Sequence, residues 1–224
     1  MYKYNLHTHT SEVSPCGHVS AEILVNMHKE AGYQGVIITD HFWPGFVNPK
    51  RGNPWQETYK IFKSGFEAAK KQGEIVGLDV FFGMELRFEE NFNDYLVFGL
   101  PDEFVLLNQN LTLMSLKEFR EKTKDLDVLI IQAHPFRKWI KVMPAELLDG
   151  VEIFNASMRH DSRNQLAADY ANTHNLIGVS GSDFHELEDI NRGEMRTKHR
   201  IIDMKDFIKT LRARNFTAIT QIAD

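Results

Sequence analysis

The sequence lacks the features that mark several large classes of protein. Its 224 residues include a single cysteine, Cys16, which excludes an internal disulfide framework and any zinc cluster built from several cysteines. No stretch approaches the roughly 18 apolar residues of a membrane-spanning helix, and residues 1–7 lack the apolar core of a secretory signal. We therefore expect a cytoplasmic protein that has no membrane partner.

Several enzyme and binding classes are also without support. The chain has no nucleophile elbow, P-loop or GxGxxG motif, which argues against serine hydrolases, NTPases and dinucleotide-dependent enzymes. A formal charge of −5 argues against a dedicated nucleic-acid binder, whose affinity depends on neutralising phosphates, although a short oligonucleotide is not excluded. The hydrophobic content of 42% and charged content of 25% are ordinary, so residues 1–224 suit one globular domain.

Short apolar runs alternate with helix-like stretches along the whole sequence. Runs that are apolar on both faces are typical of buried parallel strands, and they cover residues 36–39, 80–84, 128–132, 151–154 and 177–180. The helix candidates cover residues 20–31, 58–72, 115–124, 162–175 and 204–215. This alternation predicts a parallel α/β fold, for which closure into a barrel is the simplest form and an open doubly wound sheet is the alternative.

The ends of some helices can be predicted from single residues. Ser20 is a candidate N-cap, and Gly32 and Gly73 are natural positions for a helix to stop. Ser115 and Glu118 have the spacing of a capping box.

Two segments interrupt the alternation, and a third, separate segment is basic. Residues 42–55 are rich in proline, glycine and tryptophan and predict an ordered loop, either a rim or lid of the site or simply packed surface. Residues 88–99 predict a hairpin or a strand extension. Residues 192–200 look like a basic loop.

Residue types that bind metals stand at the ends of nearly all the predicted strands. His7 and His9 are two residues apart, which places both imidazoles on one face of a strand, and Asp183 and His185 repeat this spacing. Asp40 and His41 are adjacent, so that one can coordinate an ion while the other orients a ligand. The full set of candidate ligands is His7, His9, His18, His41, Glu85, His134, Asp183 and His185.

This set predicts a site that holds more than one metal ion. A barrel brings the carboxyl ends of its strands to one face, so these side chains would converge there. Unpaired carboxylates and imidazoles in a cleft are costly, and cations remove the conflict. Cys16 could add a thiolate, although a small loop or buried residue is the simpler interpretation. His28 and His174 lie on predicted helices and are expected to be solvated.

Taken together, the motifs resemble those of a known family. They are His7-Thr8-His9, His18, Thr39-Asp40-His41, Gly83-Met84-Glu85, Ala133-His134-Pro135, the run Val151 to Asn155, and Gly181-Ser182-Asp183-Phe184-His185. In this order they resemble the motif series of the PHP (polymerase and histidinol phosphatase) family. The resemblance implies a distorted, TIM-barrel-like (β/α)7 barrel that holds two or three Zn, Mn or Fe ions and hydrolyses phosphoesters.

The resemblance also implies which residues share each ion. One ion would bind His7, His9, Glu85 and Asp183; a second would bind Glu85 and His134; a third would bind His18, His41 and His185. The family usually supplies a further histidine to the second ion from the strand after the glutamate. Residues 93–101 contain no histidine, and Asp94 or Asn155 are the candidates to help there.

We therefore expect a hydrolase that acts on a small phosphomonoester or nucleotide. Two or three ions would acidify bound water from a pKa of about 15.7 toward 7, giving hydroxide at neutral pH. Arg159, Arg137 and then Arg192 are the candidates to neutralise charge on phosphorus, and Asp40 completes the predicted catalytic set. The alternatives are an amidohydrolase-type metal hydrolase and a catalytically silent metal-binding interaction module.

Overall fold

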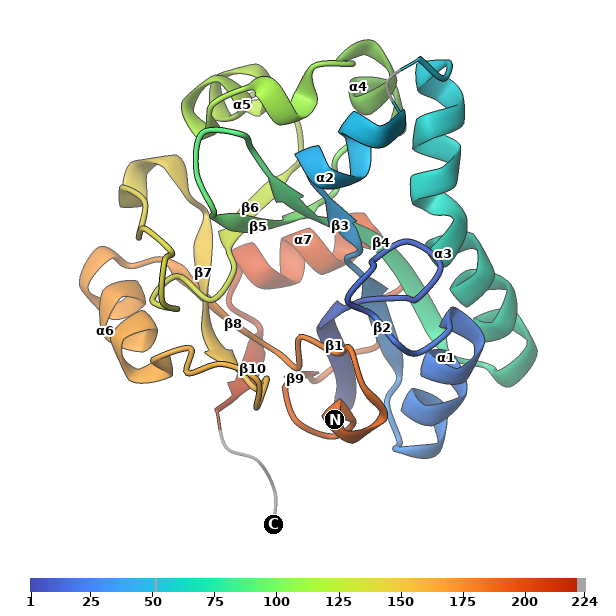
Figure 1. The fold of residues 1–224 in the computed structure, drawn as a ribbon. Helices are drawn as coiled ribbons and strands as arrows, with labels where there is room; N and C mark the ends of the chain where they lie inside the picture. Colours follow the sequence, from blue (N-terminus) through green and yellow to red (C-terminus); the bar gives the residue numbers. More distant parts are fainter. Residues whose placement is uncertain (51, 221–224) are drawn as a thin grey trace.

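Seven strands form a barrel in the computed structural model, which describes residues 1–50 and 52–220. Helices surround this barrel (Figure 1), which confirms the predicted α/β barrel. In spatial order the seven strands are β1 (Tyr2–Thr8), β2 (Gly35–Ile38), β4 (Asp79–Arg87), β5 (Asp94–Phe98), β6 (Leu129–Gln132), β7 (Gly150–Asn155) and β8 (Ile177–Gly181).

The barrel is distorted at β5. This strand runs antiparallel to both of its neighbours, β4 and β6, whereas β1, β2 and β4 are mutually parallel, as are β6, β7 and β8. The β4–β5 pair is the hairpin predicted within residues 88–99. A short strand, β3 (His41–Phe42), also pairs with β4 and places His41 opposite Glu85.

Different contacts close the barrel at its two ends. At the carboxyl end of β1, Phe184 N donates to His7 O (3.1 Å) and His9 N donates to Phe184 O (3.0 Å), which joins β1 to the segment after β8. At the other end, β9 (Glu194–Thr197) pairs antiparallel with β1, and β10 (Phe216–Ile219) pairs with β9. Part of residues 192–200 is therefore a strand, and the prediction of a loop there was wrong because this pairing partner is distant in sequence.

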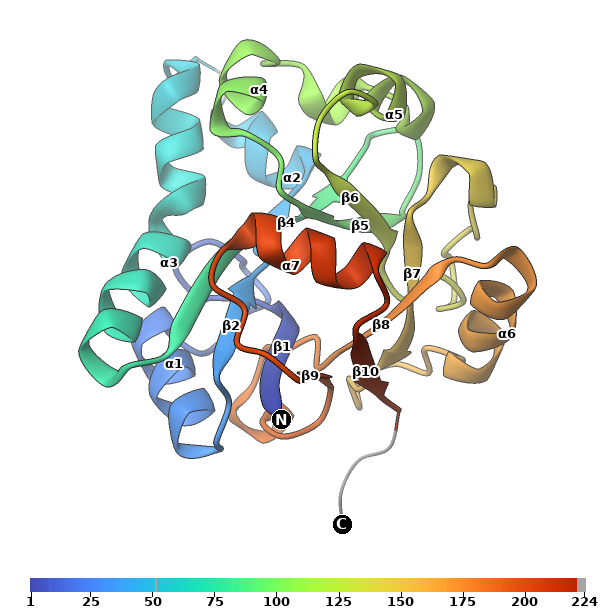
Figure 2. The same cartoon turned by 180° about the vertical axis from the view of Figure 1, so that it is seen from behind.

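One helix closes the barrel from behind. Figure 2 shows α7 (Met204–Arg212) lying across the back of the strands. Its buried residues Phe207, Ile208 and Leu211 pack in one apolar cluster with barrel residues that include Leu6 and Leu96. Because apolar side chains fill this end, polar side chains can gather only toward the other end.

The remaining helices lie around the outside of the barrel (Figure 1). They are α1 (Ala21–Glu30), α2 (Pro44–Val47), α3 (Trp55–Val76), α4 (Asp102–Leu107), α5 (Leu116–Thr123) and α6 (Asn164–His174). Four short 3-10 turns cover Asn48–Lys50, Leu111–Leu113, Ala145–Leu147 and Leu187–Asp189. In the part of the chain that the structure describes, no helix is long and apolar enough to cross a membrane.

Local sequence signals account for most helix ends. The Ser20 side chain caps α1, and Ser115 and Glu118 form the predicted capping box of α5. The stop predicted at Gly73 was wrong, because α3 continues to Gly77, which adopts a φ of 71°. Gly73 instead allows close packing, since a Cβ there would lie 2.6 Å from the carbonyl oxygen of Leu78.

Two further expectations concern His28 and the predicted loop at residues 42–55. His28 is fully buried rather than solvated, and its Nδ1 lies 2.7 Å from Leu24 O. Residues 42–55 contain the end of β3, α2, a 3-10 turn and the start of α3. Residue 51 of this predicted loop lies outside the described residues, and the expected role of the loop as a rim or lid stays a prediction.

Candidate metal centre

The carboxylate of Glu85 is the centre of a cluster of imidazoles at the open end of the barrel. Glu85 is fully buried on β4. Its oxygens lie 3.3 Å from both His7 Nε2 and His9 Nε2, 2.8 Å from His41 Nδ1 and 3.2 Å from His134 Nε2. Three strand ends that are distant in sequence, those of β1, β3 and β6, therefore deliver four nitrogen donors to one carboxylate.

Asp183 joins this cluster from the segment after β8. Its Oδ1 lies 3.4 Å from Nε2 of both His7 and His9. Asp183 and His134 adopt left-handed backbone conformations, with φ of 54° and 31°. Such strain at non-glycine residues persists only where the surrounding structure imposes it, and for Asp183 the hydrogen bonds of the adjacent Phe184 to β1 do so.

Three overlapping groups of side chains have the donor spacing of a metal site. In each group the ligand atoms all lie within 4.8 Å of one another. The groups are His7, His9 and Glu85; His9, His41 and His185; and His41, Glu85 and Asp94. His134 touches Glu85 without belonging to a group, and the ring centroid of His185 lies 4.3 Å from that of His9.

Unsatisfied polar atoms show that these residues fit a divalent cation. His7 Nε2, His9 Nε2 and Glu85 Oε2 are buried and have no hydrogen-bond partner among the described residues. A buried polar atom without a partner costs about 1–3 kcal/mol. Imidazole nitrogen and carboxylate oxygen are donors that Zn²⁺ and similar ions accept, so a cation would satisfy all three atoms.

The charges in the cluster are strongly coupled. Burial lowers the pKa of His7 but the carboxylates of Asp183, Glu152 and Glu85 outweigh it, so that this pKa lies well above its usual value. Burial also opposes protonation of His41, yet Glu85 raises its pKa well above the usual value. Burial and the neighbouring His185 and His41 hold the pKa of His9 well below the usual value.

The two acidic members respond in the opposite sense. Burial raises the pKa of Glu85 and of Asp183, but the neighbouring imidazoles, led by His41 for Glu85 and by His7 for Asp183, bring both pKa values well below the usual range. Both carboxylates are therefore charged at neutral pH and available as ligands.

Glu152 supports the cluster from β7, and the sequence reasoning gave it no role. Its Oε1 lies 2.9 Å from His7 Nδ1, and its Oε2 accepts from His134 N at 3.0 Å and from Asn155 Nδ2 at 2.9 Å. A carboxylate on Nδ1 fixes the imidazole so that its Nε2 lone pair faces an ion. An acidic residue within an otherwise apolar buried strand was the available signal.

Asp40 lies behind the cluster. Its carboxylate accepts from Thr10 N, Thr10 Oγ1 and Ser14 Oγ, each at 2.7 Å. Ser14 Oγ in turn lies 3.3 Å from His9 Nδ1 and accepts from His41 N at 3.1 Å. Asp40 thus positions two imidazoles through Ser14, and burial raises its pKa to about 6.

The predicted arginines contact the cluster through its acidic members. Arg137 Nη2 donates to Asp183 Oδ2 (2.9 Å) and to Asn155 Oδ1 (2.8 Å). Arg159 Nη1 pairs with Asp189 at 2.8 Å, and its Nη2 donates to Asp183 O at 2.9 Å. Arg192 bonds only within its own loop, to Glu188 O. Their roles toward a substrate stay predictions.

The structure does not bring His18 into the cluster. Its side chain is 63% exposed, and its Nδ1 lies 2.6 Å from Glu186 Oε1. Cys16, two residues earlier, faces the cluster instead, with its Sγ 3.1 Å from His185 Nε2. Burial opposes ionisation of this thiol, but hydrogen bonds with His185 and His41 lower its pKa to about 6.

A cavity of about 200 Å³ opens beside the cluster. It is lined by Pro15, Cys16, His41, Trp43 and Arg87. The Arg87 guanidinium lies 5.5 Å from the Trp43 ring and makes two hydrogen bonds, of 2.6 and 2.7 Å, to the carboxylate of Asp94. Asp94 occupies the region where the family resemblance leads one to expect a histidine, and its Oδ2 lies 3.9 Å from His134 Nε2.

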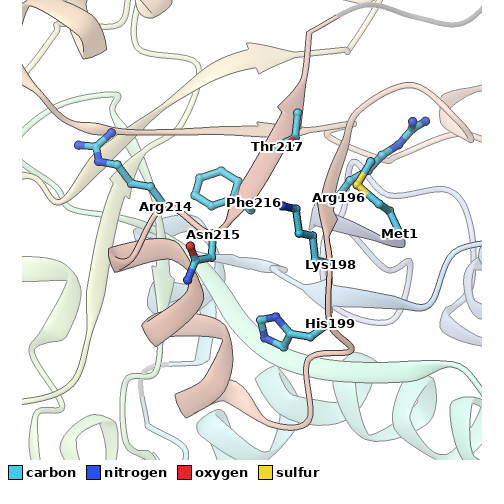
Figure 3. Close-up of a pocket in the computed structure, with 8 residues that line it drawn as sticks. All are labelled: Met1, Arg196, Lys198, His199, Arg214, Asn215, Phe216 and Thr217. Atoms are coloured by element: carbon cyan, nitrogen blue, oxygen red, sulfur yellow. The ribbon is translucent and has the colours of Figure 1, made fainter.

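A larger cavity, of about 440 Å³, lies away from the cluster. Its lining includes Met1 and Phe216, at the start of β1 and of β10, whereas the cluster lies at the end of β1. Figure 3 shows that its two arginines, Arg196 and Arg214, point away from one another. Both are already hydrogen-bonded to protein groups, so the basic groups do not converge as the imidazoles around Glu85 do.

Comparison with known proteins identifies the family. A model of the PHP domain matches residues 5–216. The chain belongs to the PHP family. No curated protein matches the chain.

Solved structures share the PHP fold of this chain. One is a two-domain protein from Bacteroides vulgatus that contains a predicted PHP-like metal-dependent phosphoesterase. It superposes with a TM-score of 0.71 at 17% sequence identity over 98% of this chain. This chain spans only 65% of that protein's length. PsfC from Pseudomonas syringae superposes with a TM-score of 0.62 at 16% sequence identity, and the match covers 93% of this chain and 88% of the other. An amidohydrolase from Chromobacterium violaceum, with bound sulfate and no metal, superposes with a TM-score of 0.56 at 14% sequence identity. The match covers 96% of this chain and 97% of the other.

Replacing Glu152 with glutamine tests its supporting role. The amide cannot hold His7 as a carboxylate does, so we expect Zn²⁺ to bind about 10- to 100-fold more weakly, as measured by competition with a chromophoric chelator. Glu146→Gln, at an exposed position, is the matched control and should bind like the parent. Equal affinities for both variants would show that Glu152 does not support the ligands.

Metal binding should release protons. Because the pKa values of His7 and His41 are raised in the metal-free protein, both rings are protonated at pH 6.5 and must lose a proton to coordinate an ion. Affinity should therefore rise as pH increases from 6.5. Titration calorimetry of Zn²⁺ in buffers with different ionisation enthalpies measures this release, and a binding enthalpy that does not depend on the buffer would contradict it.

Proposed function

We propose that this protein is a metal-dependent phosphoesterase that acts on a small phosphomonoester or nucleotide. The observation that carries the proposal is the buried carboxylate of Glu85. It lies against four imidazoles, and its own Oε2 makes no hydrogen bond to the described residues. The cluster lies at the carboxyl ends of the strands, where barrel enzymes carry their active sites. Membership of the PHP family supports the same reaction class.

The proposed ions are two or three of Zn, Mn or Fe. His7, His9, Glu85 and Asp183 would hold one ion, Glu85 and His134 a second, and His41 and His185 a third. Bound there, divalent cations supply Lewis acidity toward a phosphoryl oxygen and lower the pKa of water toward about 7. Asp94 would help at the second position, although it shares its charge with Arg87.

The residues of the chain hold this arrangement ready. Glu152 keeps His7 Nε2 directed at the ion, and Ser14, held by Asp40, does the same for His9. Preorganised charge of this kind needs no rearrangement when negative charge grows on the phosphoryl oxygens.

Arg137 is the cation best placed to meet the phosphoryl group. Its Nη2 is fixed by Asp183 and Asn155, while its Nη1 has no hydrogen bond among the described residues. A guanidinium held on one side offers its remaining N–H groups to a phosphate in a fixed direction. Both terminal nitrogens of Arg159 already donate hydrogen bonds, to the Asp189 carboxylate and to the Asp183 carbonyl. We therefore assign Arg159 a positioning role.

The cavity beside the cluster sets the scale of the substrate. About 200 Å³ accommodates a phosphate and a small organic group. Trp43 and Arg87 on its wall can contact a flat or anionic part of that group. A small ester or nucleotide suits these dimensions better than a long polymer.

The decisive experiment is an assay of the purified protein loaded with Zn²⁺, Mn²⁺ or Fe²⁺. We expect hydrolysis of p-nitrophenyl phosphate or of a member of a nucleotide panel, abolished by chelation. His9→Ala should lower kcat/KM by about 10²–10³-fold or more, the scale at which losing a preorganised electrostatic group acts. His174→Ala, at an exposed position on α6, is the matched control and should keep full activity.

Other outcomes of this assay would select the alternatives. Turnover of amides or lactones in preference to phosphoesters would favour an amidohydrolase-type enzyme. A large loss of melting temperature on chelation, without turnover of any substrate, would favour a catalytically silent metal-binding module. Either result would overturn the proposed phosphoesterase.

A further inference from the structure

The single cysteine of the chain lies at the metal centre. Cys16 Sγ is 3.1 Å from His185 Nε2, and Cys16 shares the wall of the cavity with His41. His41 and His185 belong, with His9, to a group whose donor nitrogens lie within 4.8 Å of one another. The thiol therefore lies next to the group of three imidazoles that has no carboxylate of its own.

The loop that carries Cys16 is held in place by hydrogen bonds on both sides. Ser14 N donates to Thr10 O at 3.0 Å, and Gly17 N donates to Ser14 O at 2.9 Å. His18 N donates to His185 O at 2.9 Å, which ties the loop to the segment that carries His185. These bonds fix the backbone of the loop next to His185, and the Cys16 side chain places its Sγ 3.1 Å from His185 Nε2.

His18, the residue that the family resemblance offers as a ligand here, points elsewhere. Its imidazole pairs with Glu186 at the surface. Its backbone N–H donates to His185 O at 2.9 Å, so the main chain of His18 lies beside the cluster while its side chain turns to the surface.

A second observation, on a different residue, points to a ligand at this place, because His9 faces Glu85 and Asp183 on one side and groups with His41 and His185 on the other. His9 is fully buried, and its Nε2 has no hydrogen-bond partner among the described residues. The His9 ring stacks on His41 with centroids 4.4 Å apart and lies 4.3 Å from the His185 ring. A cation among three imidazoles this close would be coordinated by their nitrogen lone pairs.

We propose that the thiolate of Cys16, together with His41 and His185, holds a divalent cation in the position for which His18 was the expected donor. This inference rests on the proposed function, because it assigns one ion of the same centre. On coordination the Cys16 S–H proton passes to solvent, and no bond is oxidised or reduced.

A thiolate changes which ions the centre selects. Soft sulfur donors favour Zn²⁺ over Mn²⁺ or Mg²⁺, whereas the carboxylate-rich position at Glu85 and Asp183 suits harder ions as well. The centre would thus combine a zinc-selective position at Cys16 with a position at Glu85 and Asp183 that also accepts harder ions such as Mn²⁺.

X-ray absorption at the zinc edge of the zinc-loaded protein tests the proposal. We expect a sulfur scatterer at about 2.3 Å from zinc, the Zn–S length of thiolate ligands. Because Cys16 is the only cysteine, no other residue can supply a thiolate. Cys16→Ser should lose the sulfur signal, and His18→Ala should keep it.

A thiol-reactivity assay gives a second measurement on the same unmutated protein. Zn²⁺ should protect Cys16 from a disulfide-exchange reagent at least about tenfold in rate relative to the metal-free protein, because a coordinated thiolate is no longer free to attack. Mn²⁺ at the same concentration should protect less.

The outcomes separate this inference from the proposed function. Zinc bound with nitrogen and oxygen donors only, with phosphoesterase activity intact, would overturn the role of Cys16 and leave the function standing. A chain that binds no zinc at all would overturn both. A sulfur signal that persists in Cys16→Ser would show that it does not come from this thiolate, and would overturn the role of Cys16.

Discussion

The structure depends on one buried carboxylate, that of Glu85, around which four imidazoles gather. Glu85 is fully buried and touches four imidazoles, yet one of its oxygens and the Nε2 atoms of His7 and His9 have no hydrogen-bond partner among the described residues. Protons can bridge only some of these atoms, because the pKa of His9 is depressed while those of His7 and His41 are raised. A cation bound among them would satisfy all three atoms, and because it would bind only the folded chain it would stabilise this end of the barrel.

The rest of the fold serves to hold the donors in place. At the far end, α7 fills the barrel with apolar side chains, and this burial offsets the cost of a polar cluster at the open end. The bridge between Thr8 and Phe184 fixes Asp183 against β1. Left-handed backbone at His134 and Asp183 costs of order 1–3 kcal/mol per residue. Glu152 and Asp40 then orient the imidazoles without contacting an ion.

What the sequence predicts follows from short-range periodicity. The two-residue spacing of His7 and His9 and the apolar runs before Glu85, His134 and Asp183 place these donors at strand ends, and the structure brings them together. The direction of a loop side chain carries no periodic signal, which is why the sequence favoured His18 over Cys16 as a ligand although the structure turns Cys16 toward the cluster. Likewise, β9 forms because distant β1 offers an edge. Glu152 stands out as an acidic residue in an apolar strand, but its role depends on His7, which is 145 residues away in the sequence.

The most direct test of a metal centre around Glu85 is anomalous diffraction at the zinc edge from crystals grown with Zn²⁺. We expect a peak at about 2.0–2.2 Å from donor atoms of His7, His9, Glu85 and Asp183. The absence of any peak within bonding distance of these four side chains, in crystals whose zinc content is confirmed by fluorescence, would contradict it.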